Sequence, residues 1–531
     1  MPKRGDYPTM SRRVDFFFIV VLLFLLLPAN FLIFKSGIYP SHDGLLHIQR
    51  IGEFYQALSL GQIPARIAPG LNQGIGVPLF IANYQLPYYL AGALVPFGGV
   101  EVAFKASLAV SYILSGVFAY AFFRRQGSAF AGFIGALFYC YLPYRFANMY
   151  ARGALGESVA LMFVPLVFLA IDLVCSGKKS GIPLLAFSVF GLVTSHNLVF
   201  AIFVPLILIF ILLKKPPRKI IFPLFFGFFL GGLLSSFQLL PVIFERKYLI
   251  LDNSFLPLYK GHLLSIFQIL RIPHPGINTG TPFQAGIASF VVILAALLLG
   301  IRRKNSQILV LALVCFASLF LISTYSLALW QNLPFLQYII FPWRFFSPFV
   351  FTTAWLAVFV FDNIKLRYLA GIVALLLLVA TGRHYFLHPT QLVSTAPVDF
   401  ISGPVEYVTI WSNDSTFAAG NAVLPSNRIF SLRESPYRIS FEIEQNRPGP
   451  ISIRRIYFPG WIVLVDDENV DLVPNNGLIS FNVAPGKHFV EVTYRESPLR
   501  EVSDWLTVAG LAVLFFILLR LYVIPLVVRR A

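Results

Sequence analysis

The feature that most constrains this chain is a series of apolar runs of the length that suits membrane-spanning helices. A helix rises about 1.5 Å per residue, so roughly 17–25 apolar residues cross the hydrocarbon of a bilayer. Twelve spans are predicted, at 15–34, 101–123, 128–146, 158–175, 182–196, 198–213, 220–241, 286–301, 307–324, 341–361, 366–384 and 504–528. Ser195-His196-Asn197 is the turn that divides the long run 182–213. The chain is therefore predicted to be a polytopic α-helical membrane protein.

The composition excludes the soluble classes of protein. Of the 531 residues, 57% are hydrophobic and 12% are charged, whereas a soluble domain carries about 25% charged residues. A soluble enzyme and a disordered chain are therefore excluded. Cys140, Cys175 and Cys315 lie in or beside apolar runs and show neither a disulfide framework nor a zinc spacing.

The net charge of +17 comes from basic clusters that all fall on one side of the predicted membrane. They precede the first span and follow every second span, at Lys3-Arg4, Arg12-Arg13, Arg124-Arg125, Lys178-Lys179, Lys214-Lys215, Arg218-Lys219, Arg302–Lys304, Lys365 with Arg367, and Arg529-Arg530. The positive-inside rule makes that side cytoplasmic, with both termini inside. The charge is explained by orientation, so no nucleic-acid partner is predicted.

The predicted organisation has three parts. Residues 1–384 form a transmembrane domain that begins with an uncleaved anchor and has long external loops at 35–100 and 242–285. Residues 385–503 form an external domain, and residues 504–531 form the last span and a cytoplasmic tail.

The external domain is predicted to be an antiparallel β-sandwich over about 425–497. Apolar and polar residues alternate with period 2 over 437–444, and similar short runs recur at 451–457, 461–465, 478–483 and 488–494. The side chains expected to face inward are Ile439, Phe441, Ile443, Val490 and Val492. The stretch 385–424 shows no clear periodicity and is left unassigned.

Polar residues that the positive-inside rule does not explain gather at the outer ends of the predicted spans. Because polar groups at membrane depth are costly, they indicate a functional site. They come from four hairpins and are His42, Asp43, His47, Arg152, Glu157, His196, Asn197 and Arg344. None of the soluble catalytic motifs occurs, such as a P-loop, G-x-S-x-G or H-E-x-x-H.

Asp43 has two interpretations. It precedes an amphipathic segment at 44–60, with apolar positions that include Leu45 and Tyr55, which predicts a helix on the outer interface. Asp43 is then its N-cap, or a general base at the mouth of a cavity, or both. Asp43 and His47 share a helix face. If a divalent metal binds, Asp43 and His47 are its predicted ligands, but no cofactor is assigned.

The other candidates also keep two interpretations. Arg152 either pairs with Glu157 or binds a phosphate through its planar fork of donors. His196 is either a hydrogen-bonded turn residue or a catalyst. Arg344, beside Trp343, is either an anchor in the aromatic belt or a second phosphate ligand.

The ordered motifs of residues 14–361 resemble a known family of bacterial membrane proteins. They are His42-Asp43-Gly44-Leu45-Leu46-His47, Gly74-Ile75-Gly76-Val77-Pro78, Leu86-Pro87-Tyr88-Tyr89, Tyr150-Ala151-Arg152-Gly153, Ser195-His196-Asn197 and Phe341-Pro342-Trp343-Arg344. The family is labelled "6-pyruvoyl-tetrahydropterin synthase-related". The pterin label finds no support in the sequence, which shows no zinc-histidine enzyme pattern.

The C-terminal part resembles the outer domain of YfhO-like membrane proteins, through Tyr457-Phe458-Pro459-Gly460-Trp461 and Ala484-Pro485-Gly486-Lys487. Both groups resemble GT-C glycosyltransferases of the bacterial inner membrane. The resemblance implies a hexosyl or pentosyl transferase that takes a sugar from a polyprenyl-phosphate donor. The acceptor would be an envelope glycan or lipid at the outer face, and Asp43 would be the base.

One departure bears on the mechanism: His42 stands where a second acid would complete the superfamily's acidic pair. A metal-independent mechanism is therefore favoured. Two rival functions remain open, a transporter or flippase of envelope lipids and a non-catalytic envelope scaffold.

The predicted topology can be tested by cysteine labelling. With single cysteines at Asn413 and Lys215, position 413 should label from outside the cell and position 215 only after permeabilisation. Labelling of both positions from the same side would contradict the predicted map.

Overall fold

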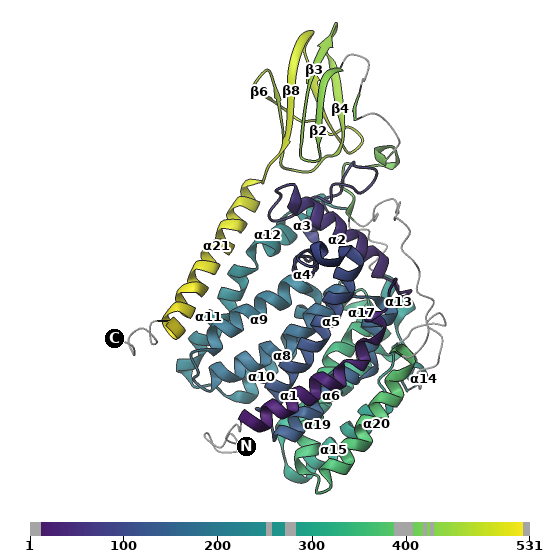
Figure 1. Ribbon diagram of the computed structural model, residues 1–531, viewed down its shortest axis with the longest axis vertical. Helices are drawn as coiled ribbons and strands as arrows, with labels where there is room; N and C mark the ends of the chain where they lie inside the picture. The colour runs from purple at the N-terminus through teal and green to yellow at the C-terminus, as the bar shows by residue number, and fades with distance from the viewer. Residues whose placement is uncertain are drawn as a thin grey trace.

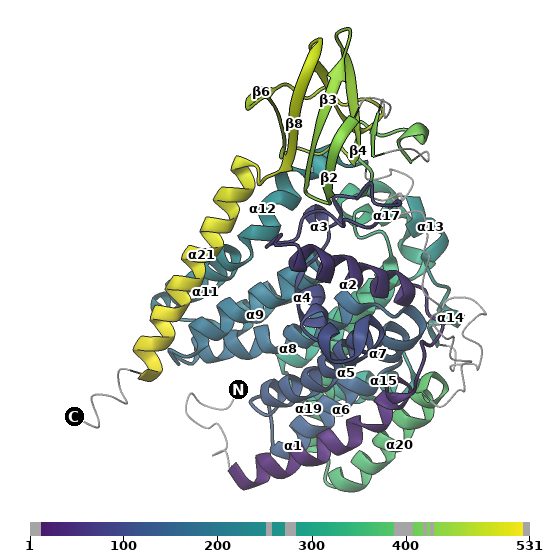
Figure 2. The same cartoon turned by 45° about the horizontal axis from the view of Figure 1, so that its top comes forward.

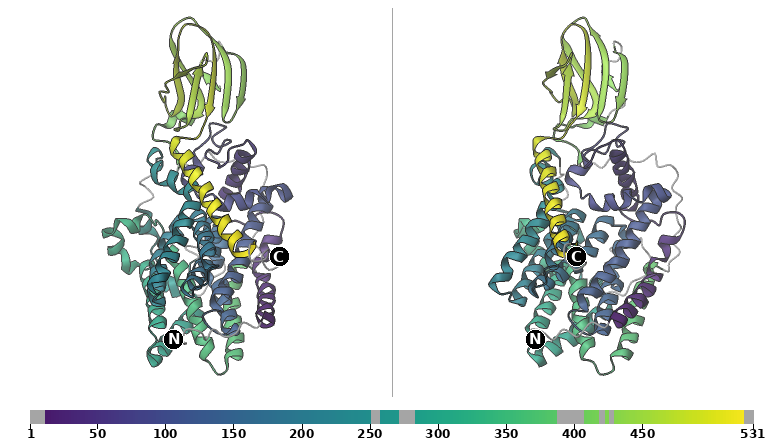
Figure 3. Two further views of the ribbon diagram at one scale, coloured as in Figure 1. Left: turned by 90° about the vertical axis from the view of Figure 1, so that its left-hand side faces the viewer. Right: turned by 60° about the vertical axis from the view of Figure 1, so that its left-hand side comes forward.

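The computed structural model describes residues 12–250, 257–270, 283–386, 407–417, 422–424 and 429–523. It consists of a helical body with a β-domain at one end (Figure 1). The last long helix, α21, runs from the β-domain back along one side of the body, as both views of Figure 3 also show. The start of α1 and the end of α21 lie away from the β-domain.

Helices form at each of the twelve predicted spans. They are α1 (Arg12–Leu26) with η1 (Pro28–Phe34), α5 (Val95–Phe123), α6 (Ala129–Tyr141) with α7 (Pro143–Phe146), α8 (Leu155–Cys175), α9 (Gly181–Ser195), α10 (Asn197–Lys214), α11 (Arg218–Leu234) with α12 (Ser236–Phe244), α15 (Ile287–Arg303), α16 (Ser306–Ile322), η6 (Pro342–Phe345) with α19 (Phe346–Asn363), α20 (Arg367–Phe386) and α21 (Pro498–Leu518). The predicted turn at His196 is confirmed.

The number of spans stays a prediction. Within the described ranges, six helices are long and apolar enough to cross a membrane, or seven if the bent pair α11–α12, which turns by 74°, is one span. Helices α6, α9, α16 and α20 are apolar but shorter. Among the long helices, α8 and α19 are the most enclosed, whereas α1 and α21 are largely exposed at the periphery.

Short helices fill the loops between the spans. In the first long loop they are α2 (Gly44–Ser59), α3 (Leu79–Ala82) and α4 (Leu86–Gly92). They lie at the end of the helical body nearer the β-domain in Figure 1, and Figure 2 shows α3 next to the β-domain. Later in the chain come η2 (Ala147–Arg152), η3 (Arg246–Tyr248), α13 (Tyr259–His262), α14 (Ile266–Leu270), η5 (Thr324–Ser326), α17 (Leu327–Asn332), α18 (Pro334–Gln337), η8 (Asp414–Phe417) and η10 (Leu519–Val523).

Helix α2 forms as predicted, but only part of its apolar face is buried. Ile48 and Ile51 of that face are at most 5% exposed, whereas Leu45 and Tyr55 are 40% and 36% exposed. His47, Arg50 and Phe54 are also buried. A helix that lies on a membrane would bury only apolar side chains. Because α2 buries a histidine and an arginine against α4 and α5, it is part of the protein interior, and its polar residues have protein partners.

Ion pairs join helix ends on the side that is predicted to be cytoplasmic. Asp172, near the end of α8, is fully buried and accepts from Arg125 Nε at 2.5 Å. It also pairs with Lys214 at the end of α10. Arg124, Arg125 and Lys214 thus fix helix ends, whereas Lys178, Lys179 and the cluster 302–304 are exposed.

The C-terminal domain is an antiparallel β-sandwich, as predicted. Its strands are β1 (Val423–Leu424), β2 (Ile429–Ser435), β3 (Arg438–Gln445), β4 (Gly449–Ile456), β5 (Trp461–Val465), β6 (Glu468–Val470), β7 (Leu478–Val483) and β8 (Gly486–Tyr494). One sheet has the order β1-β4-β7 and the other β2-β3-β8-β5-β6. Of the unassigned stretch 385–424, residues 387–406 and 418–421 lie outside the described ranges.

The alternating residues of β3 and β8 form the core of the sandwich. Phe441 pairs with Val490, and Ile439 pairs with Val492. The five side chains predicted to face inward are all at most 1% exposed. They pack against residues of β4 and β7 from the other sheet, so the period-2 pattern identified the buried face.

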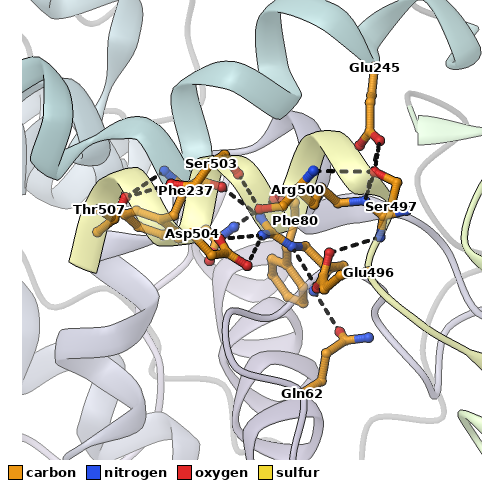
Figure 4. Close-up of polar contacts among 12 residues, drawn as sticks. Gln62, Phe80, Phe237, Glu245, Glu496, Ser497, Arg500, Ser503, Asp504 and Thr507 are labelled. Atoms are coloured by element: carbon orange, nitrogen blue, oxygen red, sulfur yellow. Dashed lines mark hydrogen bonds and ion pairs between the residues drawn. The ribbon is translucent and has the colours of Figure 1, made fainter. Parts of the chain in front are cut away.

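Two buried arginines hold the β-domain and α21 against the helical body (Figure 4). Arg66 Nη2 donates to Asp504 Oδ1 at 2.8 Å, and its Nη1 donates to the Phe237 carbonyl at 2.7 Å. Arg66 Nε donates to Glu496 at 3.1 Å, and Arg500 pairs with the same carboxylate at 3.2 Å. Both arginine side chains are 0% exposed, whereas Glu496 and Asp504 are 24% and 25% exposed, so the junction pairs two desolvated guanidinium groups with partly buried carboxylates.

Removal of the Arg66 charge should destabilise the protein strongly. Arg66→Ala leaves Asp504 and Glu496 without this guanidinium, which costs about 3–5 kcal/mol of unfolding free energy for a buried pair. The control is Arg438→Ala, since Arg438 is 66% exposed in its pair with Glu491 and should cost under about 1 kcal/mol. Unfolding in mixed detergent micelles measures both. Equal losses would contradict the role of the junction.

Candidate functional site

The first turn of α2 is joined to the end of η2 by the backbone. His42 N donates to the Ala151 carbonyl at 3.1 Å, and Asp43 N donates to the Arg152 carbonyl at 2.7 Å. Gly153 makes this approach possible, since it has φ +65° and a Cβ there would lie 3.0 Å from Gly44 Cα. Two segments more than a hundred residues apart thus bring Asp43 beside Arg152.

The Asp43 carboxylate is not used to cap its helix. Asp43 occupies the N-cap position of α2 with φ −112° and ψ −6°, but its side chain makes no capping hydrogen bond. The side chain is 37% exposed, and Oδ2 lies 3.7 Å from Arg152 Nη2. Asp43 therefore stands at the N-cap position without capping the helix, and its carboxylate remains available for other contacts.

Arg152 is fixed by a buried carboxylate. Its Nη1 donates to Glu157 Oε2 at 2.6 Å and to Asn148 Oδ1 at 2.8 Å. Glu157 is 1% exposed, and its Oε1 accepts from Tyr144 Oη at 2.5 Å and Ser347 Oγ at 3.0 Å. The predicted pairing of Arg152 with Glu157 is confirmed, and it leaves Nη2 of Arg152 directed toward Asp43.

A column of aromatic rings connects the two histidines. His47 Nδ1 is 3.0 Å from Tyr88 Oη. The Tyr84 ring stacks on Tyr88 at 5.7 Å and on His196 at 5.4 Å. His196 Nδ1 accepts from Val199 N at 3.4 Å at the start of α10, which confirms that His196 is a hydrogen-bonded turn residue.

Both histidines are neutral near physiological pH. Burial holds the pKa of His47 well below its ordinary range, and the nearby charges of Arg50 and Arg152 lower it further. Burial and the charge of Arg344 lower the pKa of His196 to about 3. The cations of this region are therefore its arginines.

Arg344 lies inside the protein. Arg344 and Trp343 are 8% and 7% exposed, so the aromatic-belt interpretation is wrong. Arg344 Nη1 donates to the Ile339 carbonyl at 2.6 Å. Its charge acts on Arg152 and Glu157, and Ser347, one turn later, donates to Glu157.

The structure gathers most of the predicted residues but not all of them. Asp43, Arg152 and Glu157 are in direct contact, Arg344 lies close to them, and His47 and His196 are linked through Tyr84. His42 is exposed, and Asn197 is half-buried with its Oδ1 2.9 Å from Leu198 N. In the part of the chain that the structure describes, neither side chain forms a hydrogen bond or ion pair with the network, although the His42 backbone bonds to Ala151.

Several participants were given no role by the sequence analysis. They are Arg50, Tyr84, Tyr88, Tyr144, Asn148 and Ser347. The spacing of Tyr84 and Tyr88 by four residues is a usable signal, because it places both rings on one face of a helical turn. Ser347 offers no signal, since a serine in an apolar span usually bonds to its own backbone.

No metal-ligand set is complete over the described ranges. No three His, Cys, Asp or Glu side chains there lie close enough together to hold a metal ion. The divalent metal at Asp43 and His47 stays a prediction.

Replacement of Gly153 should separate Asp43 from Arg152. Gly153→Ala adds a Cβ within 2.7 Å of Ser41 Oγ at a residue whose φ is +65°. The control is Gly177→Ala, which has φ +76° but nothing within 4 Å, so it has only the conformational cost of about 1–2 kcal/mol. Gly153→Ala should lower the thermal midpoint further than the control. Equal midpoints would show that the contact tolerates the methyl group.

Comparisons with known proteins give few close relatives. One curated match is an uncharacterised protein of Lactococcus lactis subsp. cremoris (strain MG1363), which is 22% identical over 229 residues. The match covers 41% of this chain and 37% of that protein, so the chain spans only about a third of that relative's length.

Two solved structures are similar to part of the chain. Both are of the arabinofuranosyltransferase AftD from mycobacteria, one of them the mutant R1389S. The first has a TM-score of 0.47 at 18% identity and covers 72% of this chain and 27% of AftD. The mutant has a TM-score of 0.47 at 17% identity and covers 70% and 28%. At these values the likeness supports no conclusion about function.

The family comparison is decisive for membership. The match extends over residues 83–387, more than half of the chain, and includes η2, α8, α10 and η6 with their site residues. The resemblance found in the sequence is confirmed, and the chain belongs to the family of membrane proteins described as the 6-pyruvoyl-tetrahydropterin synthase related domain.

Proposed function

We propose that this protein is a membrane glycosyltransferase of the GT-C type. It would move a hexosyl or pentosyl group from a polyprenyl-phosphate donor to an envelope glycan or lipid at the outer face of a bacterial inner membrane. The observation that supports this proposal best is the Asp43 carboxylate. This carboxylate is partly exposed and makes no capping hydrogen bond to its helix. It lies beside Arg152, which buried Glu157 holds in place.

The transfer needs one base and cations for a leaving phosphate. In the proposed step, Asp43 takes the proton of the acceptor hydroxyl, and that oxygen bonds to the anomeric carbon. The bond from the anomeric carbon to the phosphate oxygen breaks, and the phosphate leaves with the electron pair. Arg152 and Arg344 would stabilise the charge that develops on it.

The surroundings of Arg152 suit a preorganised cation. The hydrogen bonds that Arg152 donates to Glu157 and Asn148 fix the guanidinium plane before substrate binds. Little reorganisation is then needed in the transition state. The formal charges of Asp43, Arg152, Glu157 and Arg344 cancel.

The position of the network in the fold also supports the proposal. The network lies on the side of the body that carries α2 and the β-domain, which is the predicted outer side (Figure 2). A lipid-linked donor holds its reactive carbon at the interface, so a site at that depth can reach it. The β-domain would then hold or orient the acceptor.

Asp43→Asn should abolish transfer and leave the fold intact. Loss of a general base lowers the rate by about 10²–10⁴-fold, and no capping bond of the side chain is lost. Transfer of labelled sugar from a polyprenyl-phosphate donor in liposomes measures the effect. The control is His42→Asn, because His42 is exposed and lies outside the network.

Two outcomes would contradict the proposal. Full transfer by Asp43→Asn would remove Asp43 as the base. Movement of the donor lipid by the wild type without any transfer would favour a transporter, for which the Asp43 charge is not required.

A further inference from the structure

An apolar groove lies between α10 and α11 on the surface of the helical body. Its volume is about 340 Å³, and its lining comprises Phe200, Val204, Ile207, Leu208, Ile211, Pro216, Ile221, Leu224, Phe225 and Phe228. Leu208, Ile221 and Phe225 are each more than half exposed. The groove is thus open at the surface that faces lipid if α10 crosses the membrane.

The length of the groove matches one leaflet. On α10 its wall runs from Phe200 to Ile211, which is about 16 Å at 1.5 Å per residue. The hydrocarbon of a bilayer is about 30 Å thick, so half of it is close to this length. On α11 the lining residues belong to the first part of the helix, next to the α10–α11 turn.

Three unpaired cations stand at one end of the groove. Pro216, a lining residue, is flanked by Lys215 and, two residues later, by Arg218 and Lys219, and all three basic side chains are exposed. Lys214 differs from them, because it pairs with buried Asp172. Over the residues that the structure describes, none of the three contacts a carboxylate, so their charges are available to a ligand.

We propose that this groove is a binding site for an anionic phospholipid. One acyl chain would lie between α10 and α11, and the phosphate would bind Lys215, Arg218 and Lys219. Such a lipid requires an apolar groove for its acyl chain and unpaired positive side chains for its phosphate, and this groove provides both. The lipid would belong to the leaflet on the side of the basic clusters.

This site is separate from the candidate active site. His196 caps the start of α10, and Lys215 follows its end, so about 27 Å of helix lies between them. The proposal therefore does not depend on the proposed transferase activity, and it would survive if Asp43 proved dispensable.

Charge removal with a matched control tests the head-group contact. The test protein carries Lys215→Gln, Arg218→Gln and Lys219→Gln. The control carries Arg302→Gln, Arg303→Gln and Lys304→Gln, which are also exposed at a helix–helix turn. Lys215 and Lys304 even share a left-handed φ, of 47° and 48°.

Binding of phosphatidylglycerol to the purified full-length protein would be measured by native mass spectrometry and by the shift of the thermal midpoint. Phosphatidylcholine is the neutral comparison. The test protein should bind phosphatidylglycerol about 10²-fold more weakly, given the contribution of each basic residue near an anionic surface. The control should change less than about threefold. An equal loss in both proteins would indicate diffuse surface charge and overturn the proposal.

A second pair of variants tests the groove with all charges kept. Leu208→Trp fills it, whereas Leu212→Trp adds the same ring on α10 outside it, at a position that is 73% exposed. Leu208→Trp alone should weaken phosphatidylglycerol binding by at least tenfold. Unchanged binding, or equal thermal shifts from inorganic phosphate alone, would show that no acyl chain occupies the groove.

Discussion

The hydrogen-bonded carboxylate of Glu157 is the interaction on which the candidate site depends. It is almost fully enclosed and accepts hydrogen bonds from Arg152, Tyr144 and Ser347. These donors belong to three different elements, η2, α7 and α19. A buried charge is tolerated only when it is paired and hydrogen-bonded, so Glu157 requires all three elements to meet, and it orients Arg152 as a result.

The same principle acts at two other levels of the molecule. At the helix ends far from the β-domain, Asp172 of α8 is buried and pairs with Arg125, just after α5, and with Lys214 of α10. At the base of the β-domain, Arg66 and Arg500 are fully buried and join α12, α21 and the first long loop. In an apolar body, each desolvated charge restricts the arrangement of its partners more tightly than dispersion contacts do. Charge pairs therefore fix how the helices and the β-domain are placed relative to one another.

This organisation separates the candidate site from the rest of the surface. Asp43 is attached to the Glu157 network by backbone hydrogen bonds and by the charge of Arg152, yet its carboxylate is partly exposed. The aromatic column of Tyr84 and Tyr88 fills the space between the two neutral histidines. A rigid, mostly enclosed support under one accessible acid is the arrangement that general-base chemistry needs.

The sequence by itself determined the class of protein, the positions of the helices and the buried face of the sandwich. Those features follow from local patterns: apolar length for a span, period-2 alternation for a strand, and a polar pair such as His196-Asn197 for a turn. Most of the candidate residues that it indicated lie together in the fold, because polar side chains at span ends are costly and therefore conspicuous. Local patterns carry no information about which ends meet.

Tertiary structure decided the partners. Only the fold shows that the Asp43 side chain makes no capping hydrogen bond, that Arg344 is enclosed and that α2 buries His47 and Arg50. Ser347 and Tyr84 joined the site through contacts between segments far apart in the chain. The pairing of Arg66 with Asp504 spans 438 residues. A side chain's partner depends on how whole helices pack, and no periodicity along the sequence encodes that.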